Sequence, residues 1–462
     1  MKPHTAVWQP GAKIRCIAAD PFTHHWRARL ERYFEFQPLG TNWRTEITAG
    51  LTTFVTMAYI VVVNPAILHD AGMPYAAAVW ATCLSAAFAS IGMGWFARYP
   101  LALAPGMGLN AYFAYTVVKG LGVPWQTALG AVFLSGVAFL LLTLFGVRQV
   151  IIATIPAELT AAVSAGVGLF IAYIGFRNAG LIVPNPATIL TIGNFRDARV
   201  AVACLGLLIM AVLLARGISA AILIGILVIT AVALVLGLAG WHPQSDHLSD
   251  LAATAFHADI RASLRLGLLE IVFVFLFVDF FDNLGTLLAV GRKAGLVRKS
   301  VNEIPRLNRI LITDSLATIL SSLLGTSTVV SYIESAAGVT AGGRSGVTAI
   351  VVGLLFLLSS AAVPLIGVIP DAASAPALII VGSLMMSSVA EINWADVAIA
   401  VPAFITILMI PLTYSIANGI ACGFIAFVLI RLGLGRWREV HWLMYVLTAL
   451  FLLRFLYLGT LK

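Results

Sequence analysis

The chain has 462 residues, of which 60% are hydrophobic and only 10% are charged, and its mean hydropathy is +0.99. A soluble domain carries about 25% charged residues, so this composition excludes a soluble globular protein and indicates a chain that crosses a membrane repeatedly. The four cysteines are scattered without paired spacing, which predicts neither a disulfide framework nor a metal cluster, and we expect no cofactor. The net charge of +8 leaves nucleic-acid binding open until the positions of the basic residues are considered.

Residues 1–44 are polar and aromatic and lack the apolar core and cleavage site of a signal peptide, so we expect a cytoplasmic tail. Apolar runs close to the length of about 20 residues that a crossing helix needs then recur along the chain. The first half contains seven: 46–68, 76–97, 101–119, 126–146, 157–176, 198–215 and 218–239. The second half contains seven more: 267–290, 309–324, 326–341, 346–368, 374–390, 395–413 and 415–432. In the C-terminal tail 433–462, a further apolar run, 441–459, is interrupted by Arg454, which is typical of a helix along the membrane surface.

The positions of Lys and Arg test this count, because short cytoplasmic loops of membrane proteins are enriched in both residues. With the N-terminus in the cytoplasm, 20 of the 28 basic residues fall in inner segments and 6 in outer ones. Arg454 and Lys462, the other two, follow the fourteenth run. Losing one crossing would reverse every later loop, so the asymmetry predicts fourteen crossings of the plasma or inner membrane. The positive charge is therefore a topological signal and argues against a nucleic-acid partner.

Two of the runs are irregular for plain helices. Run 101–119 contains Pro105, Gly106 and Gly108, and run 326–341 begins with β-branched and hydroxyl residues. Irregular backbone at membrane depth is tolerated only where protein or a cavity covers it. Each run is the third of its half, and interrupted segments at corresponding positions of two halves indicate the binding site of a transporter.

An odd number of runs per half predicts that the second half is inverted relative to the first. Sliding the halves by 224 residues, from 110 to 334, places Asn110 over Glu334. We therefore expect two broken helices that face each other near the middle of the membrane.

Three acids lie well inside the predicted spans: Asp279, Asp282 and Glu334. Asp279 and Asp282 are three residues apart and share a helical face, which Asn283 extends. A carboxylate at membrane depth costs several kcal/mol, and such groups serve in proton relays and substrate sites. All eight histidines lie in tails, loops or span ends, so a proton that crosses the membrane centre must travel on a carboxylate. Carboxylates and carbonyls also suit Na⁺, and structural acids satisfied by neighbouring hydroxyls are a further alternative.

The combination of groups at the broken helices suggests the kind of ligand. Free N–H groups at a helix N-terminus suit an acceptor oxygen or an anion, whereas carboxylates accept hydrogen bonds from N–H donors. Together with Tyr112, Phe113 and Tyr332, they suit a flat, neutral ligand that carries N–H and C=O groups side by side, such as a nucleobase. The aromatic rings would be equally ordinary as core or lipid-facing residues.

Long stretches of the chain resemble a known family. They are TEITAGLTTFVTMAYIVVVNPAIL (45–68), LALAPGMGLNAYFAYTVV (101–118), FVDFFDNLGTLLAVGRKAGL (277–296), LLGTSTVVSYIESAAGV (323–339) and PALIIVGSLMM (376–386). Between about residues 42 and 432 the chain resembles the azaguanine-type (AzgA-like) purine permeases, a branch of the nucleobase–cation symporter-2 family.

This resemblance implies an all-α polytopic membrane protein of fourteen transmembrane segments in two inverted repeats, with short antiparallel strands in the two broken helices. It implies a core domain (45–147 and 267–370) that works against a gate domain (148–266 and 371–432). The expected activity is proton-coupled uptake of hypoxanthine, guanine or adenine by alternating access. A homodimer through the gate domains is a further expectation.

The resemblance also assigns roles to individual residues. The third-span Asn of the family matches Asn110, its eighth-span acid matches Asp279, and its tenth-span Glu matches Glu334. In the related uracil-type branch the eighth-span acid is a Glu followed four positions later by His, whereas here Asn283 stands at that later position. Asp282 then becomes the natural substitute, so Asp279 or Asp282 would take the coupling proton. Backbone N–H groups near residues 328–332 would meet purine acceptors. The full predicted substrate-binding set is Asn110, Phe113, Asp279, Thr328, Tyr332 and Glu334.

Other classes of function remain as alternatives. An anion exchanger of the same architecture would want a basic residue at the broken helices, where Asn110 and Glu334 stand instead. A sodium-coupled nucleobase carrier and a passive channel would have similar sequences. A membrane-embedded enzyme would need catalytic groups, but the sequence has no HExxH, no GxSxG and no Cys/His cluster, so we predict that the chain is not an enzyme.

Overall fold

The computed structural model describes residues 21–146, 156–240, 247–265, 268–293, 304 and 306–458. The predicted domain boundaries at 147/148 and 266/267 fall outside these residues. Within them the chain is helical, apart from loops and two small two-stranded sheets. Nine of the described helices are long and apolar enough to cross a membrane, and shorter apolar helices accompany them. The predicted all-α polytopic class is confirmed, while fourteen crossings in two inverted halves stay a prediction.

Helical residues occupy each of the fourteen predicted runs. The first half contains α1 (Pro21–Tyr33), α2 (Phe36–Leu39), α3 (Trp43–Met57), α4 (Ile60–Asp70), α5 (Tyr75–Gly92), η1 (Met93–Ala97), β1 (Leu103–Pro105), α6 (Met107–Ala111), η2 (Tyr112–Gly120), α7 (Trp125–Leu144), α9 (Ala157–Asn178), β2 (Ile182–Asn185), β3 (Ile189–Ile192), α10 (Ala198–Ala215) and α11 (Ala221–Val235). The predicted run 46–68 is observed as two successive helices, α3 and α4. The side chain of Asn42 begins α3 by accepting a hydrogen bond from the backbone N–H of Thr45.

The second half repeats this pattern of long and broken helices. It contains η3 (Leu248–Ala253), α12 (Ile260–Ser263), α13 (Leu269–Lys293), α14 (Leu307–Leu324), β4 (Val329–Ser331), α15 (Ser335–Thr340), α16 (Gly346–Ser359), η6 (Ser360–Ala362), α17 (Val363–Ile366), α18 (Asp371–Met385), η7 (Met386–Glu391), α19 (Val397–Leu412), α20 (Ile416–Gly433), η8 (Trp437–Glu439) and α21 (Trp442–Leu458). Side-chain caps from Asp396 and Ser415 begin α19 and α20.

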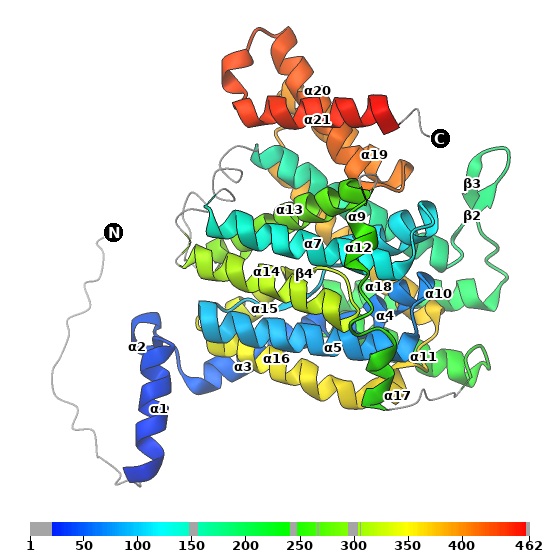
Figure 1. Ribbon diagram of the computed structural model, residues 1–462. Coiled ribbons are helices and arrows are strands. Elements are labelled where there is room, and N and C mark those ends of the chain that lie inside the picture. Colours follow the sequence, from blue (N-terminus) through cyan, green and yellow to red (C-terminus); the bar gives the residue numbers. More distant parts are fainter. Residues whose placement is uncertain are drawn as a thin grey trace, which may run out of the picture.

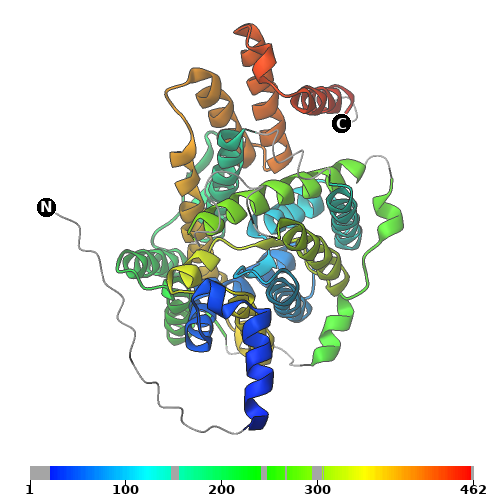
Figure 2. The ribbon, with the colours of Figure 1, turned by 90° about the vertical axis from the view of Figure 1, so that its left-hand side faces the viewer.

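The helices pack in two groups. The first helix group is α3–α7 with α13–α17, and the second helix group is α9–α11 with α18–α20. Figure 1 shows α5, α7, α13 and α14 of the first group lying side by side. Figure 2, turned by 90°, looks nearly along several of these helices and shows α1 lying across one end of the bundle. The core and gate domains, with their predicted bounds and the movement of one against the other, stay predictions.

The two irregular runs meet through a short antiparallel sheet between β1 and β4. Leu103 lies opposite Ser331, and Pro105 lies opposite Val329. The ladder is extended on both sides, because Gly106 N–H donates to the Thr328 carbonyl (2.9 Å) and Tyr332 N–H donates to that of Ala102 (3.0 Å). This matches the strands that the resemblance implies. The strands bring the starts of α6 and α15, more than 200 residues apart in the chain, to one place.

The structure corrects the expected equivalence of Asn110 and Glu334. Gly106 is the N-cap of α6, and Glu334 is the N-cap of α15. Glu334 therefore corresponds to Gly106, whereas Asn110 lies one turn inside its helix. The sliding comparison was wrong because one residue separates β1 from α6 but three separate β4 from α15. A comparison without gaps has no means of detecting this difference.

A second hairpin, β2–β3, follows α9 and was not predicted from the sequence. Its register pairs Ile182 with Ile192 and Asn185 with Ile189. The Asn185 side chain accepts a hydrogen bond from the backbone N–H of Ala187 (2.8 Å), which stabilises the turn locally. Figure 1 shows the hairpin projecting from the bundle.

Small residues allow close packing between the helices of the first group. Gly353 of α16 faces α5, and a Cβ placed on it would lie 2.7 Å from the carbonyl oxygen of Ala87 and 2.7 Å from Cγ1 of Ile91. The nearest obstacle is backbone, so it has little freedom to move aside. The pair α5–α16 therefore depends on the absence of a side chain at residue 353.

We expect Gly353→Ala to lower the free energy of unfolding by about 1–3 kcal/mol, the usual cost of overpacking a tight interface. The measurement is the thermal unfolding midpoint of the purified protein in detergent. Gly433→Ala is the matched control, because a Cβ at that position meets no atom of the described residues within 4 Å beyond its chain neighbours and its own helix backbone. Equal midpoints for the two variants would contradict the assignment of Gly353 to a tight interface.

Candidate functional site

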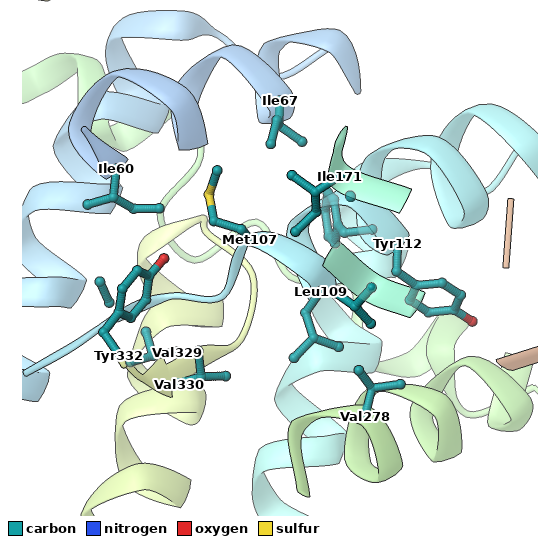
Figure 3. Packing of buried hydrophobic residues seen from close by; sticks show 14 of the residues in the cluster. Ile60, Ile67, Met107, Leu109, Tyr112, Ile171, Val278, Val329, Val330 and Tyr332 are labelled. Carbon is teal, nitrogen blue, oxygen red and sulfur yellow. The ribbon is translucent and has the colours of Figure 1, made fainter. Parts of the chain in front are cut away.

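The candidate site surrounds the β1–β4 sheet, where α6 and α15 begin. Figure 3 shows Met107 at the start of α6 and Tyr332 after β4 in this region, with Ile60 of α4 beside Tyr332. The Tyr332 hydroxyl donates to the carbonyl of Pro105 (2.5 Å), so the ring is fixed across the sheet. The region is therefore built from α4, the two broken helices and their strands.

Glu334 lies at the N-terminus of α15 and is half-buried. Its Oε1 accepts a hydrogen bond from the hydroxyl of Tyr59 (2.8 Å), a residue that is only 1% exposed. Tyr59 is the only side-chain hydrogen-bond partner of Glu334 within the part of the chain that the structure describes. A carboxylate has about four acceptor positions, so Glu334 keeps capacity for further donors.

Glu46 of α3 provides an instructive contrast, because it is fully buried and fully occupied. Its carboxylate accepts hydrogen bonds at 2.6–3.2 Å from two hydroxyls and two backbone N–H groups, those of Thr41, Thr348, Arg344 and Ser345. These bonds join α3 to the start of α16. Glu46 is thus a structural acid, and the difference from Glu334 indicates that Glu334 is placed for another purpose.

A buried polar network connects α13, α14 and β4 through one amide, that of Asn283. Its Nδ2 donates to Asp279 Oδ1 (2.8 Å) and to Asp314 Oδ2 (3.0 Å), and its Oδ1 accepts from the backbone N–H of Ser331 (2.8 Å). Asp279, Asn283 and Asp314 are each 1% exposed. The predicted acid Asp279 is therefore tied to the strand that leads to Glu334. Asp314 was not among the predicted site residues, although an acid in an apolar run was a signal for it.

Asp282 has a different environment from Asp279. It lines a hollow of about 10 Å³ together with Gly108, Thr160, Val163, Ser164, Val167 and Val278. No hydrogen bond to its carboxylate is found among the described residues. The hollow lies between α6 and α13 of the first helix group and α9 of the second, and it has room for about one water molecule. A larger ligand can enter only if the two groups separate at this point.

Asn110 belongs to a buried polar cluster. Its amide donates to the Asn64 side chain and accepts from the Ser327 hydroxyl. Asn64 in turn donates to the hydroxyls of Thr82 (2.7 Å) and Thr326 (3.1 Å). Of the two predicted roles, contact with the ligand or bracing of the site, these contacts support bracing, because they join α6 to α4, α5 and the segment before β4.

The predicted aromatic residues do not gather around one ligand position. Tyr112 and Phe113 pack against Phe275 of α13, with ring centroids 5.2 Å and 6.4 Å apart. In Figure 3 the Tyr112 side chain points away from Tyr332. The expectation that Tyr112, Phe113 and Tyr332 flank a ligand together is therefore not supported by their positions, because helix packing occupies two of the rings. A contact of Phe113 with the substrate stays a prediction.

The backbone donors expected near residues 328–332 are partly occupied. Ser331 N–H donates to Asn283 and Tyr332 N–H donates to Ala102, so neither is available to a ligand in this conformation. The buried hydroxyl of Thr328 makes no hydrogen bond within the described residues. The N–H groups of the first turn of α6, at Met107 and Gly108, precede the first helical hydrogen bond, from Asn110 to Gly106. Of these two residues, Gly108 lines the same hollow as Asp282.

Sequence comparison adds to this geometry. Residues 44–422 match the profile of a family described as the permease family. The chain belongs to the permease family. This permease is 46% identical over 429 residues to the adenine permease AdeP of Escherichia coli (strain K12), covering 93% of this chain and 96% of AdeP. It is 44% identical over 441 residues to the guanine/hypoxanthine permease PbuG of Bacillus subtilis (strain 168), covering 93% and 100% of the two chains. The predicted family is confirmed, and the permease is a transporter and not an enzyme.

Solved structures of other membrane proteins have a fold similar to that of this chain. The permease is similar to the transmembrane domain of the cyanobacterial bicarbonate transporter BicA, with a TM-score of 0.61 over 83% of this chain and 97% of that one. It is also similar to SLC26A9, with a TM-score of 0.57 over 91% of this chain and 73% of that one. The sequence identities are 14% and 12%, so the likeness shows the fold alone. The permease therefore shares a membrane-transporter fold with proteins of very different sequence.

Proposed function

We propose that this permease is a secondary active transporter for the uptake of purine nucleobases, namely adenine, guanine and hypoxanthine, together with protons. The observation that carries the proposal is the half-buried carboxylate of Glu334, which has one side-chain hydrogen-bond partner, at the start of a broken helix. The names of the relatives AdeP and PbuG support the substrate class. A purine has ring and exocyclic N–H groups, to which a carboxylate is a suitable acceptor, beside acceptor atoms that suit backbone N–H donors.

The proposed binding mode uses groups at the starts of the two broken helices and on α13. Glu334 accepts hydrogen bonds from purine N–H groups while Tyr59 holds the carboxylate in place. The first-turn N–H groups of α6 donate to an acceptor atom on the base. Asp279 contacts the base from α13, and Asn110 keeps α6 in position through its buried cluster. Binding requires the hollow beside Gly108 to widen, because its present volume is about 10 Å³.

The proposed coupling depends on removing charge from the site. Asp282 faces the boundary between the two helix groups and lies within electrostatic reach of Glu334 and Asp314. A carboxylate there opposes movement through an apolar interface, because an unpaired buried charge is costly. A proton bound to Asp282 removes that cost and allows the first group to slide against the second. Asp279 is the other candidate carrier, but it already has a hydrogen bond from Asn283.

The orientation and assembly of the permease are part of the same proposal. The enrichment of Lys and Arg in alternate loops supports an N-terminus in the cytoplasm and a location in the plasma or inner membrane. The first helix group acts as the core domain and the second as the gate domain, in two inverted repeats. Dimerisation through the gate domains accompanies this arrangement.

The direct test is uptake of radiolabelled hypoxanthine by cells that lack their own purine carriers, with adenine and guanine as competitors. We expect accumulation that both bases reduce and that a protonophore abolishes. Accumulation that requires Na⁺ and ignores the protonophore would favour a sodium-coupled carrier. Uptake that equilibrates without concentrating the base would favour a channel, and exchange of inorganic anions without purine uptake would favour an anion exchanger.

A further inference from the structure

The C-terminal helix α21 packs across α20. The Arg454 guanidinium, near the end of α21, donates from Nη2 to Oδ1 of Asn418, near the start of α20 (2.9 Å). Three residues earlier, Phe451 lies edge-on to Phe424 of α20, with ring centroids 6.0 Å apart. The two helices are therefore in contact, and Figures 1 and 2 show α21 crossing α20 at one edge of the bundle. The surface location suggested by the sequence for run 441–459 stays a prediction.

The same part of α21 also contacts the first helix group. Nε of Arg454 donates to Glu270 in the first turn of α13, which forms an ion pair. The Phe451 ring lies 5.9 Å from Phe273 and 6.0 Å from Phe277, both on α13. Arg454 thus joins a helix of the first group to a helix of the second through a single side chain.

We propose that α21 is a clasp in which Arg454 positions α13 against α20 in the conformation of this structure and releases one of them during transport. The proposal rests on the relative movement of the two helix groups that the proposed function requires. Hydrogen bonds from one guanidinium to two acceptors hold only within about 3.2 Å. A displacement of α13 along α20 by a few ångströms therefore breaks at least one of them. Since α13 also carries Asp279 and Asp282, the clasp acts on the helix that carries the predicted proton site.

The environment of Arg454 gives the contact its strength. The side chains of Arg454 and Glu270 are only 20% and 26% exposed, at the edge of a helix bundle that lies in a membrane. An ion pair shielded from water is disrupted at a higher cost than a surface pair, because each lost partner leaves a poorly solvated charge. The contact therefore favours the present conformation, and its removal shifts the equilibrium toward the conformation in which the groups have moved.

A reporter for that shift is available in the hollow between the two groups. Ser164 of α9 lines it opposite Gly108 of α6 and is partly buried. In a variant with the four native cysteines replaced by serine, Ser164→Cys can be labelled by a charged thiosulfonate reagent in detergent. The labelling rate rises when the groups separate, because the closed hollow holds about one water molecule. This readout requires no purine.

We expect Arg454→Gln to raise the labelling rate of the Ser164→Cys reporter about tenfold, the factor that corresponds to one charge-assisted hydrogen bond. Glu270→Gln should act in the same direction, and the charge exchange Glu270→Arg with Arg454→Glu should reverse part of the change. Arg438→Gln is the matched control, since Arg438 is exposed and its guanidinium lies over the ring of the neighbouring Trp437 in η8.

The clasp is overturned if Arg454→Gln is labelled at the rate of the parent and the charge exchange has no effect. A helix that merely stabilises the fold would lower the thermal midpoint in all three variants without restoring labelling in the charge exchange. Labelling is measured without substrate, so it tests the clasp independently of transport. A failure of the proposed function would instead appear as absent purine uptake by the unmodified permease.

Discussion

Replacing Glu334 by alanine is expected to reduce the initial rate of purine uptake at least about a hundredfold, since two charge-assisted hydrogen bonds each contribute about 1.5–3 kcal/mol. Glu334→Gln should be nearly as inactive, because the amide offers one acceptor oxygen in place of two and has no charge. The measurement is the uptake of radiolabelled hypoxanthine, normalised to the amount of permease in the membrane. Purine binding to the purified protein should weaken in parallel.

Two further variants serve as controls for Glu334→Ala. Glu391→Ala removes an exposed carboxylate at the end of η7, so uptake should stay at the level of the unmodified permease. Tyr59→Phe removes the hydroxyl that holds Glu334 and should cause a smaller loss than Glu334→Ala. Full uptake by Glu334→Ala would remove this residue from the site and with it the binding mode proposed here.

Asp282→Asn is expected to separate substrate movement from proton movement. The amide is uncharged at every pH, so the site resembles the protonated carrier permanently. In vesicles, the variant should exchange purine across the membrane but fail to concentrate it when a proton gradient is imposed, with accumulation falling about tenfold or more. Purine-dependent acidification of the vesicle lumen should also disappear.

Asp279→Asn serves as the comparison, because Asp279 already accepts a hydrogen bond from Asn283 within the network that includes Asp314. An amide at residue 279 disturbs that network, so binding should suffer as well as coupling. If Asp282→Asn accumulates purine against its gradient as the unmodified permease does, Asp282 does not carry the proton. If Asp279→Asn alone shows exchange without accumulation, the proton belongs to Asp279.

The acids of this chain differ in how many hydrogen-bond donors surround them, and their expected roles differ accordingly. Glu46 and Glu334 are both glutamates in predicted membrane segments, yet Glu46 is saturated by four donor residues whereas Glu334 has one side-chain donor. Asp279 and Asp282 are three residues apart on one helix, yet only Asp279 bonds to Asn283. The two acids in each comparison are of the same residue type and lie in predicted membrane segments. The number of donors that tertiary packing brings to each carboxylate is what distinguishes them.

The sequence by itself determined the class of the protein and the location of its unusual segments. High hydropathy and few charges report directly on a lipid environment, because each residue contributes to that balance independently of its neighbours. Pro105, Gly106 and the β-branched start of run 326–341 marked the broken helices, since these residues weaken a helix locally. The acids of α13 and Glu334 stood out because a carboxylate inside an apolar run is costly in a membrane. The long motifs led to the correct family.

Only the tertiary structure decided which groups meet. Several decisive contacts join residues that are distant in the chain. They are the β1–β4 register, the partners of Asn110, the packing of Tyr112 and Phe113 on Phe275, and the ion pair of Arg454 with Glu270. Such contacts depend on the lengths of short connections and on how neighbouring helices fill space, which a pattern of residue types does not contain. Hydropathy records whether a residue avoids water, whereas the identity of its partner is fixed when the helices pack.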